Sequence, residues 1–393
     1  MMKKSNKKVL IFLVWYGMGG STLYISQYVT YLVKNGYRVF VVCRKPDKGS
    51  FFLKQIGAIP IYVHFPFALN FTALDEFNNT VKKRIIDFIK LVIGFFLSLY
   101  LLLIYKPKIV IIGEFCEIPV LLSASLFRNK TICLFQTSIS RTKWKRIILF
   151  HLLKSIDHLV GITPLHTTIL PFKDKINIVP NILISTNNTS KSIEINNLTV
   201  KDSKVIFFMG GISRTKGTHY FVEIALELLK LRNDLCFIIA GNFHKRFKTK
   251  LCKGSDNNDF YYNEIIFTRI GDLLDKKFIF LGEIIGITEV LKMSDLLMST
   301  NIYPHFSRPI VEAYANKIPV AANLDTYTKY MCHNKESILL IDNMRTVESA
   351  RLINVLLNSK MHIEKQIFEG YNNYKKYYSQ EVAENALAKL FLE

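Results

Sequence analysis

Two stretches of the sequence place charged side chains where an anion could bind. The segment "GGISRTKG" (residues 210–217) joins an apolar run to an amphipathic one and contains Arg214 and Lys216. The N-terminus of a helix carries partial positive charge, so two cations there oppose the helix dipole unless an anion joins them. This conflict favours a diphosphate site, and solvated surface cations are the alternative. The Walker pattern G-x-x-x-x-G-K-[ST] is absent.

The second stretch, "HFSRPIVEAYANKIPV" (residues 305–320), predicts a short helix with Glu312 in its first turn. Ser307 can cap this helix and Pro309 suits its first turn, so a purely structural role for these residues is open. However, the helix follows "DLLMSTNIY", a strand that runs toward the same sheet edge as residues 210–217. A carboxylate at that edge can accept hydrogen bonds from a ribose diol, while the N–H groups of the helix face phosphate.

A third glycine-rich turn, "YGMGGS" (residues 16–21), follows the first apolar run. It does not match G-x-G-x-x-G, and the next strand ends in Arg44 and Lys45, where an NAD site requires an acid. The two cations leave NADP as a minor alternative. The glycines either make a tight turn only or let a ligand approach the next helix.

The chain predicts two α/β domains with parallel sheets, because its 393 residues exceed what one core usually supports and the same element order occurs twice. That order is an apolar strand, a glycine-rich turn, an amphipathic helix and another strand; the first strand is expected at Val9–Trp15. A segment rich in Asn, Ser and Thr separates the halves. The expected limits are residues 1–185, a linker at 186–203, residues 204–370, and helices over 371–393 that could return to the first domain.

The positive charge belongs mainly to the N-terminal half. Residues 1–185 hold 25 Lys and Arg against 8 Asp and Glu, a net charge of +17, whereas residues 186–393 have a net charge of +4. An apolar segment at residues 85–105 has basic flanks, and "SRTKWKR" (residues 140–146) surrounds Trp144 with cations. These features favour contact with an anionic membrane surface, although a solvated loop explains residues 140–146 equally simply. No nucleic-acid recognition motif is found, so we expect no nucleic-acid partner.

Residues 85–105 allow three interpretations. Their charge-free run, Leu91–Tyr105, has 15 residues, which is short for a transmembrane helix. The second interpretation is a buried helix, and the third is a helix that dips partly into the lipid interface. The basic start of the chain could also pass for a signal peptide, but a strand, turn and helix account for it better. The six cysteines are scattered, which indicates a reduced, cytoplasmic chain and no metal site.

Seven segments, in this order and spacing, resemble the family 4 glycosyltransferases of the GT-B fold, bacterial surface-polysaccharide type. They are "GMGGS", "KINIVPNILI", "GGISRTKG", "CFIIAGN", "FIFLGEI", "FSRPIVEAYANKIPVAA" and "SILLID". The resemblance implies two Rossmann-like domains that face a cleft, with a nucleotide-diphospho-sugar on the C-terminal domain and the acceptor on the N-terminal one. It implies sugar transfer with retention at the anomeric carbon, without a bound metal or other cofactor.

Matched residue by residue, the resemblance assigns three groups of donor-binding residues. Lys216 is expected at the donor diphosphate and Glu312 at the ribose. The further positions expected at the diphosphate are Arg214, Gly211, Gly19 and Gly20, and those of the donor loop are Ser307, Arg308, Pro309 and Ile310. No catalytic base is assigned.

The sequence departs from the family pattern at several positions. Pro304 stands at the first glutamate of E-x7-E, Ser307 at the usual glycine, and Gly211 at the usual arginine, which Arg214 could replace. No histidine occurs at Gln136 or its neighbours, where the family often has one. His64 and His305 are left unassigned.

The resulting expectation is a hexosyl-type glycosyltransferase, peripheral on the inner face of the cytoplasmic membrane, that extends a lipid-linked or oligosaccharide acceptor in O-antigen, capsule or lipopolysaccharide synthesis. Two alternatives stay open. A catalytically degenerate GT-B protein could act as a membrane-associated partner of other transferases, and a GT-B epimerase or phosphorylase is a more distant possibility.

Overall fold

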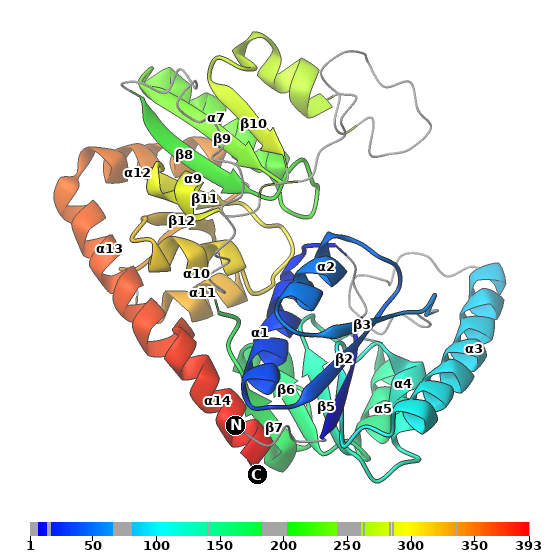
Figure 1. The fold of residues 1–393 in the computed structure, drawn as a ribbon. Coiled ribbons are helices and arrows are strands. Elements are labelled where there is room, and N and C mark those ends of the chain that lie inside the picture. Colours follow the sequence, from blue (N-terminus) through cyan, green and yellow to red (C-terminus); the bar gives the residue numbers. More distant parts are fainter. Residues whose placement is uncertain are drawn as a thin grey trace. The chain divides into compact units, whose positions relative to one another are not determined.

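The computed structural model describes residues 7–13, 17–65, 81–139, 142–182, 203–241, 261, 264–282, 284, 287–334 and 336–392. The chain forms two compact units (Figure 1). Unit 1 comprises residues 1–184 and 380–393, and unit 2 comprises residues 185–379.

The described part of unit 1 is built on a parallel sheet with the strand order β3-β2-β1-β4-β5-β6-β7. The strands are β1 (Lys8–Phe12), β2 (Arg38–Cys43), β3 (Ile59–Tyr62), β4 (Ile109–Ile112), β5 (Lys130–Phe135), β6 (His158–Gly161) and β7 (Ile176–Ile178). Their central members are continuous apolar runs that are buried on both faces, as expected for parallel strands covered by helices.

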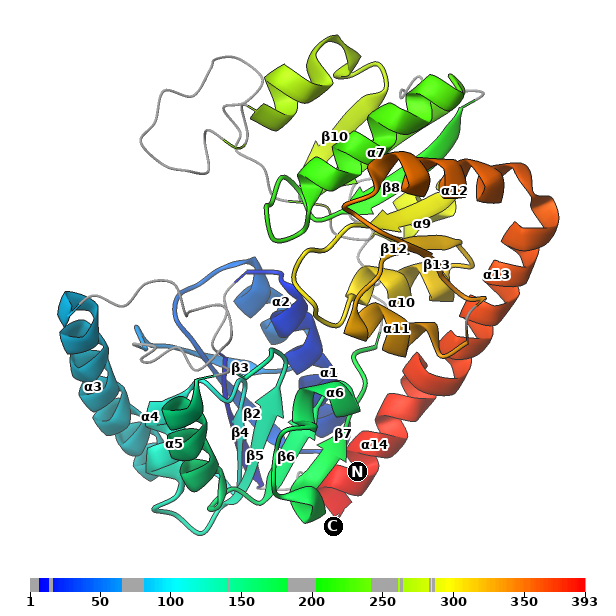
Figure 2. The ribbon, with the colours of Figure 1, turned by 180° about the vertical axis from the view of Figure 1, so that it is seen from behind.

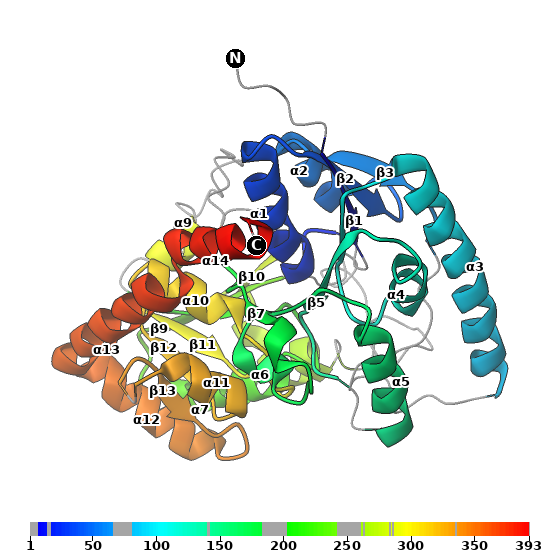
Figure 3. The same cartoon turned by 90° about the horizontal axis from the view of Figure 1, so that it is seen from below.

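Helices cover both faces of this sheet. They are α1 (Gly20–Lys34), α2 (Lys48–Gln55), α3 (Val81–Tyr105), α4 (Ile118–Ala124), α5 (Lys143–Leu153), α6 (Pro164–Thr167) and α14 (Gln380–Leu392). Figure 3 shows α1 and α14 on one face and α3, α4 and α5 on the other. The second face holds one continuous apolar core, in which the Phe115 and Phe135 rings stack with centroids 5.1 Å apart.

The last helix of the chain belongs to unit 1. α14 packs against α1 and β7, with Phe391 stacked on Tyr31 (centroids 5.8 Å apart) and Lys34 paired with Glu384 at 3.8 Å. It follows α13 (Lys360–Asn373) and a π-helical turn at Tyr374–Tyr378, which belong to unit 2. From the sequence we expected the C-terminal helices to begin at residue 371. In the structure the chain passes from unit 2 to unit 1 at residue 380.

The described part of unit 2 has a second parallel sheet, with the order β10-β9-β8-β11-β12-β13. Its strands are β8 (Lys204–Met209), β9 (Leu235–Ala240), β10 (Phe278–Gly282), β11 (Leu296–Ser299), β12 (Val320–Asn323) and β13 (Leu339–Ile341). Its helices are α7 (Thr218–Leu231), α9 (Thr288–Lys292), α10 (Arg308–Ala315), α11 (Thr326–Cys332), α12 (Thr346–Asn358) and α13. α7 and α12 pack together and enclose a core with the strands (Figure 2).

Each sheet has one point where the strand order reverses direction. In unit 1 the chain builds outward from β1 through β2 and β3 and then returns to β4 on the other side of β1. In unit 2 it builds from β8 through β9 and β10 and returns to β11 beside β8. Ligands of open parallel sheets bind at the carboxyl ends of the strands at such switch points. The predicted α/β architecture of two doubly wound parallel sheets is therefore confirmed.

The details of three predicted segments differ. The first strand ends at Phe12, earlier than the predicted Trp15, and residues 14–16 lie outside the described part of the chain. The linker predicted at 186–203 also lies outside it, except for Ser203. Arg141 of the basic segment 140–146 is not described either.

α3 is not the buried helix that was one interpretation of residues 85–105. Its segment Ile85–Tyr105 is 21 residues long and apolar enough to cross a membrane, and only 22% of it is buried. Apolar side chains exposed along it are Ile85, Ile86, Phe88, Ile89, Val92, Ile93, Phe96, Tyr100, Leu103 and Ile104. Since they recur three and four residues apart, they share one face. The opposite face packs on α4.

Candidate functional site

The turn after β8 is stabilised by its own hydrogen bonds. The N–H groups of Gly210 and Gly211 both donate to Ala240 O at 2.9 Å, and Ser213 N–H donates to Thr218 Oγ1 at 2.9 Å. Gly211 has φ +61°, a conformation that suits glycine. These three N–H groups are therefore already used within the chain. The side chain of Lys216 becomes the main candidate for contact with the anion that the sequence predicts at this turn.

Gly217 fixes the turn after β8 against the turn after β11. It has φ +70°, and a Cβ added to it would lie 1.9 Å from Thr300 O. In return, Thr300 Oγ1 donates to Gly217 O at 2.9 Å. Glycine is thus required here by both conformation and space. The two turns meet at the switch point of the unit 2 sheet.

Lys216 is paired with His305, a residue to which the sequence assigned no role. Lys216 Nζ lies 2.8 Å from His305 Nε2, and His305 Nδ1 lies 2.7 Å from Tyr303 O. Because a carbonyl can only accept, Nδ1 carries the proton and Nε2 accepts from the lysine. Burial and the neighbouring ammonium lower the pKa of His305 to about 4, and burial lowers that of Lys216. The ammonium is therefore held by a neutral partner at the carboxyl end of the sheet.

Arg214 does not share this contact. Its side chain is exposed, and its guanidinium lies 4.6 Å from the centroid of the Tyr261 ring. Tyr261 Oη in turn accepts from His219 N–H at 3.1 Å in the first turn of α7. The cation–π contact holds Arg214 at the start of α7.

Glu312 lies in the second turn of α10, not in the first as predicted. It is 4% exposed, and its Oε1 accepts from Arg308 Nε at 2.8 Å. Among the described residues, no hydrogen-bond partner is found for its Oε2, for Arg308 Nη1 or for Ser307 Oγ. Burial raises the pKa of Glu312, and Arg308 opposes that effect. Ser307 occupies the cap position without making a cap hydrogen bond, so its predicted capping role is wrong.

These unpartnered atoms indicate where a ligand could bind. Buried polar atoms normally have partners, because leaving one unpaired costs about 1–3 kcal/mol. Pro309 and Ile310 follow in the first turn of the same helix, whose N-terminus they share with Ser307 and Arg308. Ser307 Oγ, Arg308 Nη1 and Glu312 Oε2 could together bind a polyhydroxyl group.

Three asparagines at the ends of neighbouring strands support this region, and the sequence analysis did not identify them. Asn323 Nδ2 donates to Asn301 O at 3.0 Å, and Asn343 Nδ2 donates to Thr300 O at 2.8 Å. Asn343 N–H donates to Asn323 Oδ1 at 3.2 Å. This network connects the carboxyl ends of β11, β12 and β13. Its signal in the sequence is an asparagine within two residues of the end of each of these strands.

The glycine-rich turn of unit 1 is open. Gly17, with φ +84°, donates its N–H to Asp47 Oδ2 at 2.7 Å. In contrast, a Cβ added at Gly19 or Gly20 would meet nothing within 4 Å. Neither residue has a positive φ, so packing does not require glycine at either position. The start of α1, where Gly19 is the cap residue, is thus uncovered by neighbouring atoms.

Two buried carboxyl groups, Glu114 and Glu117, follow β4 at the switch point of unit 1, and the sequence analysis missed both. Burial raises the pKa of Glu114 to about 8, and burial with the neighbouring Glu114 raises that of Glu117 well above its ordinary value. Their burial depends on tertiary packing, which a single acid in a sequence does not indicate. Among the described residues, no group of three or more His, Cys, Asp and Glu is arranged to hold a metal ion.

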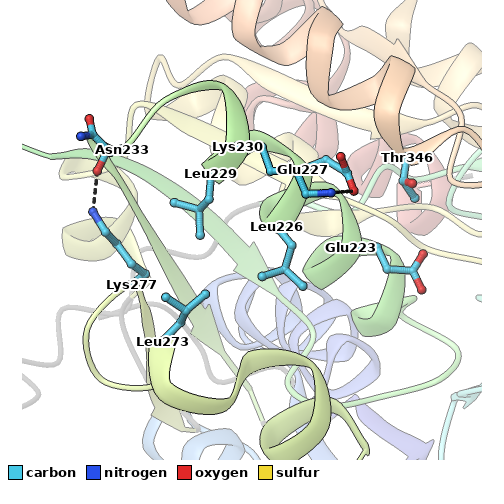
Figure 4. A pocket seen from close by; sticks show the side chains of 9 residues that line it. All are labelled: Glu223, Leu226, Glu227, Leu229, Lys230, Asn233, Leu273, Lys277 and Thr346. Carbon is cyan, nitrogen blue, oxygen red and sulfur yellow. Dashed lines mark hydrogen bonds and ion pairs between the residues drawn. The ribbon is translucent and has the colours of Figure 1, made fainter.

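A separate groove of about 750 Å³ lies on unit 2. Leu226, Leu229 and Leu273 line it together with the charged residues Glu227 and Lys230 (Figure 4). It lies toward the carboxyl end of α7, whereas Gly217 and Lys216 precede the amino end of that helix. None of the predicted site residues lines this groove.

Comparison with known proteins agrees with this geometry. Residues 190–377 match the family described as "Glycosyl transferases group 1". This segment, which makes up most of unit 2, is therefore similar to that family. This segment contains Lys216, His305 and Glu312. No curated protein matches the chain at a significant level.

Solved structures extend the likeness to the whole chain. The Anabaena protein Alr3699/HepE, in complex with UDP and glucose, is 14% identical with a TM-score of 0.74, over 99% of this chain and 100% of that one. A glycosyltransferase from Rickettsia africae is 16% identical with a TM-score of 0.73, over 98% and 97%. Sucrose-phosphate synthase from Thermosynechococcus elongatus is 12% identical with a TM-score of 0.71, over 98% of both. At these identities the likeness establishes the GT-B fold.

We expect Gly217→Ala to lower the free energy of unfolding by more than about 2 kcal/mol, because it adds left-handed strain and a clash with Thr300 O. Denaturant titration measures this value. The control is Gly20→Ala, whose Cβ meets no atom, and its stability should be unchanged or slightly higher. Equal stability of the two variants would contradict the close contact.

The carboxyls of Glu114 and Glu117 predict a pH dependence of stability. Their pKa in the folded chain exceeds the ordinary 4.5, so folding takes up protons between about pH 4.5 and 8. The free energy of unfolding should fall as pH rises through this range, by at most about 1.4 kcal/mol per pH unit and group. Tyr24, Cys116 and Cys133 lie nearby and titrate above it.

Denaturant titrations at pH 5.5, 7.0 and 8.5 measure this slope in the native chain, in Glu114→Gln and in the control Glu348→Gln, whose side chain is exposed. The slope should be smaller in Glu114→Gln than in the other two. Identical slopes in all three proteins would show that Glu114 titrates normally.

Proposed function

We propose that this protein is a hexosyl-type glycosyltransferase that takes its sugar from a nucleotide-diphospho-sugar. Two findings support the donor class. Residues 190–377 match the glycosyl transferases group 1 family, and a protein of the same fold, Anabaena Alr3699/HepE, was solved with UDP and glucose and with UDP-glucose. The proposed acceptor is a lipid-linked or oligosaccharide glycan on unit 1, in bacterial surface-polysaccharide synthesis of the O-antigen, capsule or lipopolysaccharide kind.

The observation that carries this proposal is the set of incompletely paired charges at the switch point of unit 2. In the described part of the chain, Lys216 has a neutral histidine as its partner and no carboxylate. Glu312 keeps one buried oxygen without a partner. An ammonium of this kind gains a charge-assisted contact when a diphosphate binds, and the free carboxylate oxygen can accept from a ribose hydroxyl.

The Lys216–His305 pair connects the two halves of the proposed donor site. His305 lies two residues before Ser307, which occupies the position before the first residue of the helix that holds Glu312. The hydrogen bond therefore joins the diphosphate residue after β8 to the loop that leads into α10. Within unit 2 we assign Gly211 to close approach of the diphosphate, with Arg214 as a further cation that could turn from Tyr261 toward it. Gly19 and Gly20, which the resemblance also assigns to the diphosphate, lie on unit 1. Ser307, Arg308, Pro309 and Ile310 form the proposed donor loop.

The proposed reaction breaks the bond between the anomeric carbon and the diphosphate and forms one to an acceptor oxygen, with retention as the resemblance implies. Negative charge develops on the departing diphosphate, so the Lys216 ammonium stabilises the transition state more than the ground state. Glu312 and the donor loop position the donor, and this positioning supplies the remaining reduction of the activation barrier. We assign no metal and no cofactor to this step.

α3 supports a proposed location on the inner face of the cytoplasmic membrane. Along Ile85–Tyr105, where side-chain burial is described, the exposed face contains no charged residue, and Asp87 and Lys90 are half-buried. Lys106 and Lys108 follow it directly, and Trp144, 54% exposed, lies among lysines on α5. A large apolar patch with basic borders suits an anionic lipid interface. A membrane-bound position would bring the chain to a lipid-linked acceptor.

Lys216→Ala and Glu312→Ala should each weaken binding of the donor nucleotide ten- to a hundredfold, because each removes one charge-assisted contact of about 1.5–3 kcal/mol. Calorimetric titration with UDP, GDP and their sugars gives the dissociation constants. Lys230→Ala, at the far end of α7 with an exposed side chain, is the matched control and should bind as the native chain does.

Unchanged affinity in both variants would remove the proposed donor site. If the native chain binds none of these nucleotides, the alternative of a degenerate GT-B partner protein gains support.

The chain should bind vesicles of phosphatidylglycerol at low salt and leave them at high salt, since screening weakens the contribution of about 1 kcal/mol per basic residue. Replacing Phe88 and Phe96 by serine should reduce binding, because both rings are more than 60% exposed on α3. The control is Phe368→Ser, an equally exposed ring on α13. Sedimentation measures binding, and native protein that stays in the supernatant at low salt refutes the membrane surface.

A further inference from the structure

Glu114 and Glu117 occupy the position in unit 1 that the donor residues occupy in unit 2. They follow β4, which lies beside β1 at the point where the strand order reverses. The turn after β1 contains Gly19 and Gly20, over which there is open space. This edge of an open parallel sheet is where a ligand is expected.

The two carboxyl groups have too few partners for their burial. Glu114 is 0% exposed and Glu117 is 1% exposed. Glu114 Oε1 accepts one long hydrogen bond from Gln136 N–H, at 3.3 Å, and the N–H groups of Phe115 and Thr137 and the Thr137 hydroxyl also stabilise the charged form of this acid. Within the described part of the chain, Glu114 Oε2 and both oxygens of Glu117 lack a hydrogen-bond partner. Gly113 N–H lies near Glu117, but it donates to Phe12 O at 2.9 Å.

The fold makes little use of the Glu117 carboxyl group, and neither acid has a cation as its partner in the described chain. Glu117 is the cap residue of α4, but its side chain makes no cap hydrogen bond. No lysine or arginine is among the groups that shift the pKa of either acid in the described chain. Buried acids without a counter-ion destabilise a protein, and replacement by a neutral residue of similar size is often neutral or stabilising. Their presence at a switch point is therefore better explained by a ligand than by stability.

We propose that Glu114, Glu117 and Gln136 form a binding site for hydroxyl groups of a sugar-like acceptor. The assignment rests on the proposed function, because it names residues for the acceptor side of that reaction. Gln136 is half-buried, and its Nε2 donates to Gly113 O at 2.7 Å, which leaves its amide oxygen to accept from the ligand.

The composition of the site favours a neutral polyol. Two adjacent carboxyl groups in a buried place retain a proton, so together they can both donate to and accept from hydroxyl groups. Ser21 Oγ, in the first turn of α1 after β1, is a further buried hydroxyl without a partner. Hydroxyl groups of a sugar ring would satisfy these atoms without bringing a second charge into the core.

The test uses the full chain and octyl glucoside, octyl galactoside and octyl mannoside below their micelle concentrations, with 1-octanol as the control for apolar binding. A bound glycoside should raise the melting temperature of the native chain beyond the octanol effect by about 2 °C or more. This sugar-specific shift should vanish in Glu117→Gln and shrink in Gln136→Ala. It should persist in the control Glu289→Gln, whose carboxylate is exposed.

Glu117→Gln should itself melt at the same temperature as the native chain or higher. Equal glycoside shifts in Glu117→Gln and the native chain would overturn the proposal, as would the absence of a shift with every glycoside. If Glu117→Gln does not fold, the acid is structural and Gln136→Ala decides the assignment alone. The glycoside shift is independent of nucleotide binding, so failure of the donor titrations would leave this result intact.

Discussion

The contact between Gly217 and Thr300 determines the geometry of the proposed donor site. It brings the turn after β8 so close to the end of β11 that no side chain fits between them. Lys216 precedes this contact, and the loop after Thr300 leads through His305 to the helix of Glu312. Residues that are about 90 positions apart in the chain thereby share one edge of the sheet. The asparagines after β11, β12 and β13 stabilise the same edge.

Charges at this edge are satisfied only in part. Lys216 is held by an uncharged imidazole, and Glu312 has one arginine contact for two oxygens. A structure selected for stability alone would pair such groups fully or replace them. Unit 1 shows the same pattern more strongly in Glu114 and Glu117, which have no cation nearby among the described residues. In both sheets, buried polar atoms without a hydrogen-bond partner among the described residues lie near the switch point.

The sequence predicts the fold because parallel strands buried on both faces are continuous apolar runs, and here the first strand of each unit is followed by a glycine-rich turn and an amphipathic helix. This local pattern holds for β1 and α1 and again for β8 and α7. The local sequence also identifies Lys216, since the charge of a lysine beside a helix N-terminus opposes the helix dipole. The pairing with His305 could not be predicted in this way, because it joins residues 89 positions apart.

Other features depend on burial, which the local pattern does not specify. An apolar run such as residues 85–105 is compatible with a core helix or a lipid-facing one, and only packing distinguishes them. Glu114 and Glu117 resemble ordinary surface acids in the sequence, and only their 0% and 1% exposure makes them unusual. The second-turn position of Glu312 and the free hydroxyl of Ser307 follow from where α10 begins.

Hydrogen exchange of the full chain with and without a nucleoside diphosphate tests the central claim most directly, because it maps the binding site by peptide. With UDP or GDP, whichever binds, we expect slower exchange in peptides that cover residues 210–218 and 300–313. We expect no change in peptides of α12, which begins at Thr346, a residue that lines the separate groove on unit 2. Protection that falls elsewhere on unit 2 and spares residues 210–218 would contradict the account.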